Sequence, residues 1–179
     1  MKAWLALSRA IDAVNDGFAM LAKWAVAFAC FISAGNAIVR YSFDYSSNAY
    51  LELQWYLFAV CVMLGAPQVL RMNEHVRVDV LYGLYPSRGK VWLDLAGLCL
   101  FLLPMAVLIG VLTWPLVVDQ FHSGERSNNA GGLIRWPVTA TVPLGLALLS
   151  LQAMSEVIKR IAWLRRLFEM DTHYDRPLQ

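Results

Sequence analysis

The hydrophobic and polar positions of the chain alternate in long blocks, and four of these blocks are mostly apolar. They cover about residues 17–39, 50–70, 91–118 and 133–153. A helix needs about 20 mostly apolar residues to cross the roughly 30 Å hydrocarbon core of a bilayer, and each block meets that length. A barrel would need many short alternating strands, and the sequence has no such pattern. The pattern therefore predicts an all-α integral membrane protein with four transmembrane helices.

Prolines lie inside the third and fourth blocks. Pro104 lies inside the long third block, and Pro137 and Pro143 lie in the fourth. Transmembrane helices tolerate proline because neighbouring groups can satisfy the backbone carbonyls that it frees. We expect the third helix to tilt, or to bend at Pro104.

Lysine and arginine are distributed unequally among the segments that join the blocks. The first, third and fifth of these segments hold Lys2, Arg9, Arg71, Arg77, Arg88, Lys90, Lys159, Arg160, Arg165, Arg166 and Arg176, whereas the other two hold only Arg40, Arg126 and Arg135. Basic residues concentrate in the cytoplasmic loops of membrane proteins. This distribution predicts that both termini and the middle loop are cytoplasmic.

The first 18 residues carry apolar side chains at helical spacing. These are Trp4, Leu7, Ile11, Val14 and Phe18, with Lys2, Arg9, Asp12 and Asp16 elsewhere on the helical wheel. Such a pattern is typical of an amphipathic helix that lies in the membrane interface. The alternative is a simple extension of the first span. Asp12, Asn15 and Asp16 interrupt any short apolar core, so a cleavable signal peptide is not predicted.

The length of the chain favours one domain, which we place at residues 1–168. The fourth helix is expected to continue beyond the bilayer over Ser155–Phe168. Residues 169–179 are polar and terminal, so we expect them to be disordered.

Composition and charge exclude several other classes of protein. The chain is 59% hydrophobic, and its net charge is only +2, so it has no basic field for nucleic acid. Its three cysteines, Cys30, Cys61 and Cys99, lie within apolar blocks and form no zinc-type or disulfide pattern. No metal or cofactor is predicted in this chain.

Ionisable residues are scarce inside the four blocks. Lys23 and Asp94 lie near the inner ends of their blocks, and Glu52 lies near an outer end. A pump or an ion-coupled carrier normally places carboxylates at mid-membrane or contains inverted repeats. The sequence therefore does not resemble a complete transporter. Glu52 is expected to pair with Arg40 across the first outer loop, or else with a partner protein, because an isolated charge at this depth is unfavourable.

Two other features concern packing. Small residues recur every four positions in the first block, at Ala25, Ala29, Ser33 and Ala37. Such residues let helices approach closely, either within the bundle or at a partner interface. The loop after the second block alternates strictly, with His75, Arg77 and Asp79 on one side and Val76, Val78 and Val80 on the other. An isolated strand is unstable, so we expect this loop to pack against something else.

The loop from Asp119 to Arg135 is the only outer loop long enough to present much surface to an external protein. It contains the glycine-rich stretch from Asn128 to Gly132, which we expect to be flexible, and no recognisable ligand motif.

Several of these positions together resemble one family. Arg40 follows the first block, Glu52 opens the second, Gly65-Ala66 lies within it, and the loop from Asn73 to Asp79 follows; Pro143-Leu-Gly145 lies in the fourth block. The combination resembles the small membrane subunit of tripartite ATP-independent periplasmic (TRAP) transporters over about residues 9–166. The stretch Ser123–Ser127, together with Arg135-Trp-Pro, is similar to the subgroup that takes up oxo acids.

The resemblance implies a supporting role. In that family a periplasmic binding protein delivers an organic acid, commonly a carboxylate, to two membrane subunits. The large subunit holds the substrate and sodium sites and moves like an elevator. The small subunit forms a heterodimer with it as a scaffold and helps to dock the binding protein. The resemblance implies a location in the bacterial inner membrane. It also implies roles in fold or subunit contact, and not in catalysis, for Arg40, Glu52, Gly65, Ala66, His75, Val76, Arg77, Val78, Asp79, Pro143 and Gly145.

Two alternatives belong to other functional classes. A haem or quinone anchor of a respiratory complex would need axial histidines on facing spans, but His75, His122 and His173 all lie outside the four blocks. An autonomous exporter would need a polar site within the bundle and would transport without another subunit. The sequence contains no phosphate-binding loop for ATP hydrolysis.

Overall fold

Helices account for nearly all regular structure in the described part of the chain. The computed structural model describes residues 2–45, 47–73, 85–129 and 131–169. Its elements are the α-helices α1 (Lys2–Phe43), α2 (Asn48–Met72), α4 (Ser87–Ala96), α5 (Leu103–Ser123) and α6 (Trp136–Leu164), and the π-helix η1 (Gly97–Leu102) between α4 and α5. The one exception in these ranges is an isolated antiparallel bridge between Arg126 and Ile134.

The four apolar blocks lie within helices except for residues 133–135. Four helical runs have the length and the apolar composition needed to cross a membrane: α1, α2, the continuous run Ser87–Ser123 and α6. The prediction of an all-helical chain with four such spans is therefore confirmed. The fourth helix begins at Trp136 instead of residue 133 and continues to Leu164, so most of the expected extension beyond the bilayer is helical.

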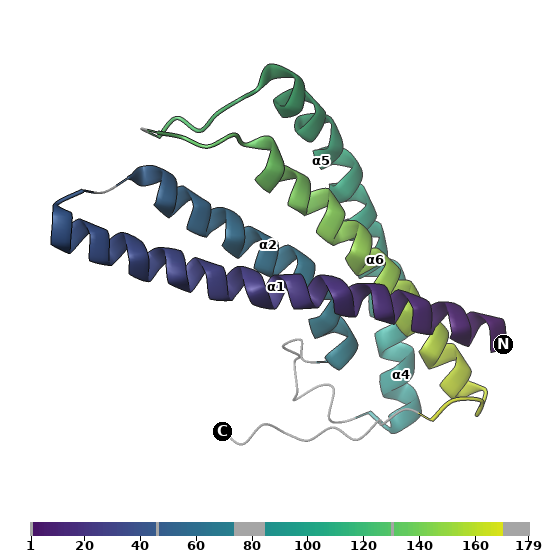
Figure 1. Cartoon of the computed structure of the whole chain (residues 1–179). Coiled ribbons are helices and arrows are strands. Elements are labelled where there is room, and N and C mark those ends of the chain that lie inside the picture. The colour runs from purple at the N-terminus through teal and green to yellow at the C-terminus, as the bar shows by residue number, and fades with distance from the viewer. Residues whose placement is uncertain (1, 46, 74–84, 130, 170–179) are drawn as a thin grey trace.

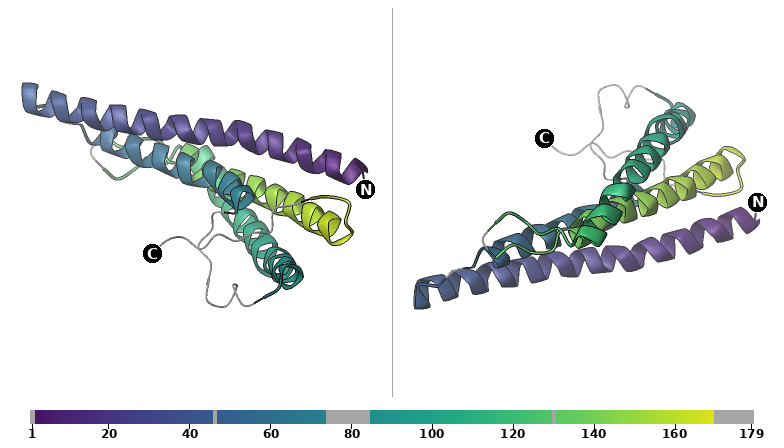
Figure 2. Two further views of the ribbon diagram at one scale, coloured as in Figure 1. Left: turned by 90° about the horizontal axis from the view of Figure 1, so that it is seen from below. Right: turned by 90° about the horizontal axis from the view of Figure 1, so that it is seen from above.

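The helices form two pairs that spread apart from a shared base. α1 runs beside α2, and α5 runs beside α6 (Figure 1). α6 also packs against α1, α2 and α4, so it is the central helix of the fold. Figure 2 shows α1 as a long rod along the outside of the bundle, with α2 and α6 beside it. The pairs diverge toward the end that carries the α1–α2 and α5–α6 connections (Figure 1).

The N-terminal segment is not a separate helix. α1 is one uninterrupted helix of 42 residues, which corresponds to about 63 Å at 1.5 Å per residue. Residues 2–18 are thus helical and in line with the first span, and their position at the membrane interface stays a prediction. Asp12, which lies apart from the apolar face of the helical wheel, is buried together with Ser8 and Asn15. These side chains find partners on α6, which explains why the segment stays in line with the span.

The irregularity expected at Pro104 is a π-helical segment. η1 ends at Leu102, and Pro104 lies at the start of α5. Proline has no backbone N–H, and its ring crowds the carbonyl four residues earlier, so it disturbs the regular α-helical hydrogen bonds before it. A wider π turn accommodates the mismatch within a continuous helical run.

The buried apolar contacts are small in number and lie along α6. Leu148 forms one cluster with Ala22 and Leu64, which joins α1, α2 and α6. Ala153 forms a second cluster with Leu70 and Leu98, which joins α2, η1 and α6. Large apolar side chains elsewhere are exposed, among them Trp24, Phe31, Trp55, Leu100, Phe101 and Leu112. Such a distribution is expected where lipid or another membrane subunit covers the outside of a bundle.

Candidate functional site

The glycine of the Pro143-Leu-Gly145 motif lies where two helices nearly touch. A Cβ atom added to Gly145 would lie 2.6 Å from the backbone oxygen of Met63 in α2 and 2.7 Å from the Met63 Cβ. Only glycine fits this distance without a shift of the backbone. Pro143 lies one half-turn earlier, inside α6. The motif therefore forms the crossing of α6 with α2.

The Gly65-Ala66 pair lies where α2 meets α1. A Cβ atom on Gly65 would lie 3.8 Å from the Cβ of Ala22, which is an ordinary contact. Ala66 lines a shallow groove of about 460 Å³ between the two helices, whose rim includes Lys23. Of the small-residue stripe on α1, Ala25 is buried while Ser33 and Ala37 are exposed, so only the inner part of that stripe packs within the bundle.

Glu52 does not pair with Arg40. Its side chain is 4% exposed, and its carboxylate accepts hydrogen bonds from the backbone N–H of Leu133 at 2.7 Å and from the Nδ2 of Asn129 at 3.2 Å. Arg40 is exposed at the end of α1, and no ion pair joins the two within the described ranges. The expected pair was based on nearness in sequence. In the folded chain, the α5–α6 connection lies against Glu52 instead.

The α5–α6 connection is a small hairpin, within which the sequence predicted a flexible stretch at residues 128–132. The Ser127 N–H donates to the Leu133 carbonyl at 2.9 Å, and the Arg135 N–H donates to the Glu125 carbonyl at 3.0 Å. The side chains of Glu125 and Arg135 form an ion pair at 2.7 Å. The Tyr56 hydroxyl donates to the Ile134 carbonyl at 3.2 Å. Residues 124–129 and 131–135, called the outer hairpin below after the orientation that the sequence predicts, are thus attached to α2 at three points.

The end of the bundle that the sequence predicts to be cytoplasmic, called the inner end below, contains a buried polar seam between α1 and α6, which the sequence analysis did not predict. The Asn15 Nδ2 donates to the Gln152 Oε1 at 2.7 Å, and the Gln152 Nε2 donates to Asp12 at 2.9 Å. The Ser155 hydroxyl also donates to Asp12 at 2.9 Å and lies 2.7 Å from the hydroxyl of Ser8. Because a carboxylate only accepts hydrogen bonds, Asp12 determines the direction of this chain of bonds.

Charged side chains extend the seam to the other helices. Lys159 pairs with Asp12 at 2.8 Å and with Glu156 at 2.9 Å. Arg160 pairs with Glu156 and reaches Asp94 of α4 at 3.2 Å. Arg71, at the end of α2, pairs with Asp16 and lies 3.9 Å from Asp12. The inner ends of α1, α2, α4 and α6 are therefore joined by one ionic network.

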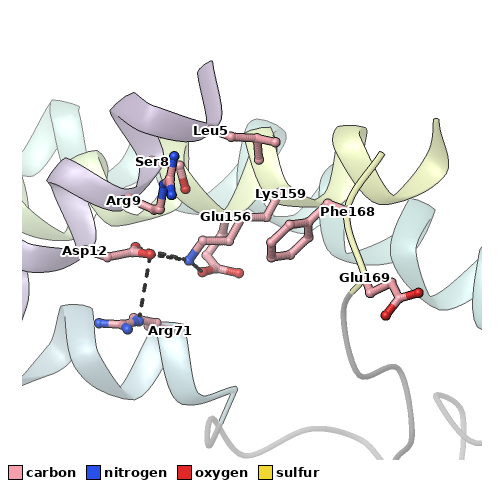
Figure 3. A pocket seen from close by; sticks show the side chains of 9 residues that line it. All are labelled: Leu5, Ser8, Arg9, Asp12, Arg71, Glu156, Lys159, Phe168 and Glu169. Atoms are coloured by element: carbon pink, nitrogen blue, oxygen red, sulfur yellow. Dashed lines mark hydrogen bonds and ion pairs between the residues drawn. The ribbon is translucent and has the colours of Figure 1, made fainter. Parts of the chain in front are cut away.

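A pocket of about 520 Å³ opens beside this network (Figure 3). Its lining residues are Leu5, Ser8, Arg9, Asp12, Arg71, Glu156, Lys159, Phe168 and Glu169. Asp12, Arg71 and Lys159 line one side of the pocket, where the side chains of Arg71 and Lys159 point toward the Asp12 carboxylate (Figure 3). Within the described ranges, Asp12, Arg71 and Lys159 form ion pairs with one another. These ion pairs hold α1, α2 and α6 together, and the three side chains present no activated nucleophile, acid or base.

Five of the predicted positions, His75, Val76, Arg77, Val78 and Asp79, lie outside the described residues. His122 is exposed on the last turn of α5. No group of three or more histidine, cysteine, aspartate or glutamate side chains in the described part of the chain could hold a metal ion.

Spacing is the signal that could have revealed the inner seam. Ser8, Asp12 and Asn15 recur at intervals of four and three residues, as do Gln152, Ser155 and Lys159 at intervals of three and four. Each set lies on one face of its helix. Two polar stripes of matching length, each at the same end of an otherwise apolar helix, indicate helices that pair through these stripes.

Comparison with known proteins identifies the family. Residues 29–162 match the family described as tripartite ATP-independent periplasmic transporters, DctQ component. Over 155 residues the chain is 26% identical to the C4-dicarboxylate TRAP transporter small permease protein DctQ of Vibrio cholerae serotype O1. This alignment covers 74% of the chain and spans 63% of the length of that relative. No solved structure matches. Because the family match covers most of the chain, including both glycine motifs and Glu52, the chain belongs to the DctQ component family of tripartite ATP-independent periplasmic transporters.

Proposed function

We propose that this chain is the small, non-catalytic membrane subunit of a sodium-driven transporter that imports an organic acid with the help of a periplasmic binding protein. Membership in the DctQ family makes it a transporter subunit and not an enzyme. One observation carries the proposal: the buried charged side chains of the described helices are tied to one another or to the outer hairpin, at the two ends of the bundle. The middle of the bundle is left to apolar packing.

The division of labour follows from this distribution. A transported carboxylate and its coupling ions need polar partners inside the bilayer, and we assign those partners to the large subunit. The large subunit would hold the substrate and sodium sites and move like an elevator. The present chain would form a heterodimer with it and widen its stationary scaffold. A framework for such a role must resist deformation, which suits helices linked at both ends.

The outside of the bundle suits a membrane environment with one protein partner. Trp24, Phe28 and Phe31 of α1 are exposed, as are Leu108 and Leu112 of α5. These faces would contact lipid tails and the large subunit. No role in nucleic-acid binding is proposed, because the net charge is only +2.

The substrate class is proposed from the relative. The protein from Vibrio cholerae is named for a C4-dicarboxylate transporter, so we propose a carboxylate for the present system. We propose that the chain lies in the bacterial inner membrane with both termini in the cytoplasm, in accordance with the distribution of lysine and arginine. The outer hairpin would then face the periplasm, where it would help to dock the binding protein.

Reconstitution tests this function. Vesicles would contain this subunit alone, the large subunit alone, or both, each with the binding protein and an inward sodium gradient. We expect uptake of a labelled dicarboxylate only when both membrane subunits are present. Uptake by this chain alone, or full uptake by the large subunit alone, would reject the scaffold role.

A further inference from the structure

We propose that the outer hairpin is the element of this subunit that contacts the periplasmic binding protein, with Arg126 and Ile134 as its contact residues. Glu52 is the positioning residue that holds the hairpin on α2. This inference rests on the proposed function, since it takes the partner to be the binding protein of the same transport system.

The hairpin has a preformed backbone. Gly124 and Gly131 adopt left-handed backbone conformations, with φ of 63° and 74°. Residues other than glycine rarely adopt such conformations. Gly132 packs so closely against the Ser127 carbonyl that a Cβ atom would clash with it. A loop that is already ordered loses little conformational entropy when a partner binds, and this raises its affinity.

The hairpin is also held in one position. Glu52 is 4% exposed, and both of its oxygens accept hydrogen bonds from the hairpin. The donors include the side-chain amide of Asn129, the backbone N–H of Leu133 and the side chain of Ser127, all of which are uncharged. A buried carboxylate devoted to a connecting loop implies that the position of the loop matters, because uncharged side chains could close the end of the bundle without desolvating a charge.

The geometry of the hairpin separates its side chains into two faces. Arg126 and Ile134 are directly opposite in the antiparallel bridge. The flanking backbone bonds, Ser127 N–H to Leu133 and Arg135 N–H to Glu125, make them a non-hydrogen-bonded pair, whose side chains lie close together on the same face. Glu125 and Arg135 alternate to the other face, where they pair with each other.

The first face is therefore a small amphipathic surface without an internal partner. Arg126 is exposed, and it forms no ion pair within the described ranges. Ile134 is 41% exposed beside it. An arginine next to an apolar side chain is a typical composition for a protein–protein contact. The complementary surface is a water-soluble protein with carboxylates around an apolar patch.

Charge reversal of Arg126 tests the contact. The native complex and its Arg126→Glu and Glu52→Gln variants would be placed in lipid nanodiscs, and binding of the purified periplasmic binding protein would be measured by biolayer interferometry. Arg126→Glu should weaken binding roughly tenfold at low salt, mainly through slower association, and the difference should shrink at high salt. Arg165→Glu, the same charge change at an exposed position at the opposite end of the bundle, should leave binding within about twofold of native.

Glu52→Gln keeps the size of the side chain but removes its charge. It should weaken binding while increasing hydrogen–deuterium exchange in residues 124–135. Native affinity in both variants would overturn the hairpin assignment, and so would equal weakening by Arg126→Glu and Arg165→Glu. If both variants bind normally while the native assembly transports, only this inference fails. If the native assembly shows no uptake at all, the proposed function itself fails.

Discussion

Replacing Gly145 with alanine should loosen the crossing of α2 and α6. The added Cβ would lie 2.6 Å from the backbone oxygen of Met63, whereas ordinary van der Waals contact begins at 3.4 Å. The difference, 3.4 minus 2.6, requires the two helices to separate by about 0.8 Å. The obstacle is backbone, so no side-chain rotation can relieve it.

The expected loss of stability follows from two opposing terms. Overpacking costs about 1–3 kcal/mol, and contact with backbone places this site at the upper end, near ~3 kcal/mol. Alanine is a better helix former than glycine by about 1 kcal/mol. The net destabilisation of Gly145→Ala should therefore be about 2 kcal/mol.

Gly110→Ala in α5 is the matched control. Its added Cβ would meet only the Cβ of Leu146, at 3.8 Å, so the gain in helix propensity is not offset by a clash. We expect this variant to be as stable as the native protein or more stable by up to about 1 kcal/mol.

Titration with sodium dodecyl sulfate in mixed micelles, followed by far-ultraviolet circular dichroism, would measure both variants. The refolding branch must be recorded as well, because irreversible unfolding reports a rate instead of a free energy. If Gly145→Ala and Gly110→Ala shift the transition equally, the close approach of α2 to α6 is wrong.

Three further predictions concern the inner end of the bundle and the loop that follows α2. Asp12→Ala should cost about 2 kcal/mol, because it removes the buried carboxylate that accepts hydrogen bonds from Gln152 and Ser155 and pairs with Lys159. Asp16→Ala should cost less than about 1 kcal/mol, because its pair with Arg71 is more exposed; similar losses in the same titration would contradict the buried seam. Arg160→Met should speed hydrogen–deuterium exchange in α4, since it removes the ion pair with Asp94; unchanged exchange would show that α4 is held by other contacts. Serine in place of the three valines in residues 76–80 should reduce co-purification with the large subunit while membrane insertion persists, and undiminished co-purification would count against a packed loop.

The sequence was sufficient to predict the helices because their signal is local. Each of the four blocks is long and apolar, and a backbone in a bilayer has to satisfy its own hydrogen bonds, so the helical state follows without knowledge of neighbours. A disturbance near Pro104 follows from a local property of proline, but its form, a π-helical segment instead of the predicted tilt or bend, was not predicted. The boundaries were less well predicted: α1 extends back to Lys2, and α6 begins at Trp136.

Contacts between distant segments were not predictable in the same way. Glu52 was matched with Arg40, 12 positions away in the sequence, but its partners Asn129 and Leu133 are 77 and 81 residues distant. The register of the hairpin and the spread of the helices determine which donors reach the carboxylate. No local pattern contains that information.

The amino-acid sequence by itself determined that this chain forms four membrane-length helices with the charges near their ends, because hydrophobicity and helical periodicity act over a few turns. Only the tertiary structure decided that Asp12 meets Gln152, Ser155 and Lys159, and that Gly145 meets Met63. Those pairings depend on the rotation and axial register of packed helices, which the summed contacts of the whole bundle select.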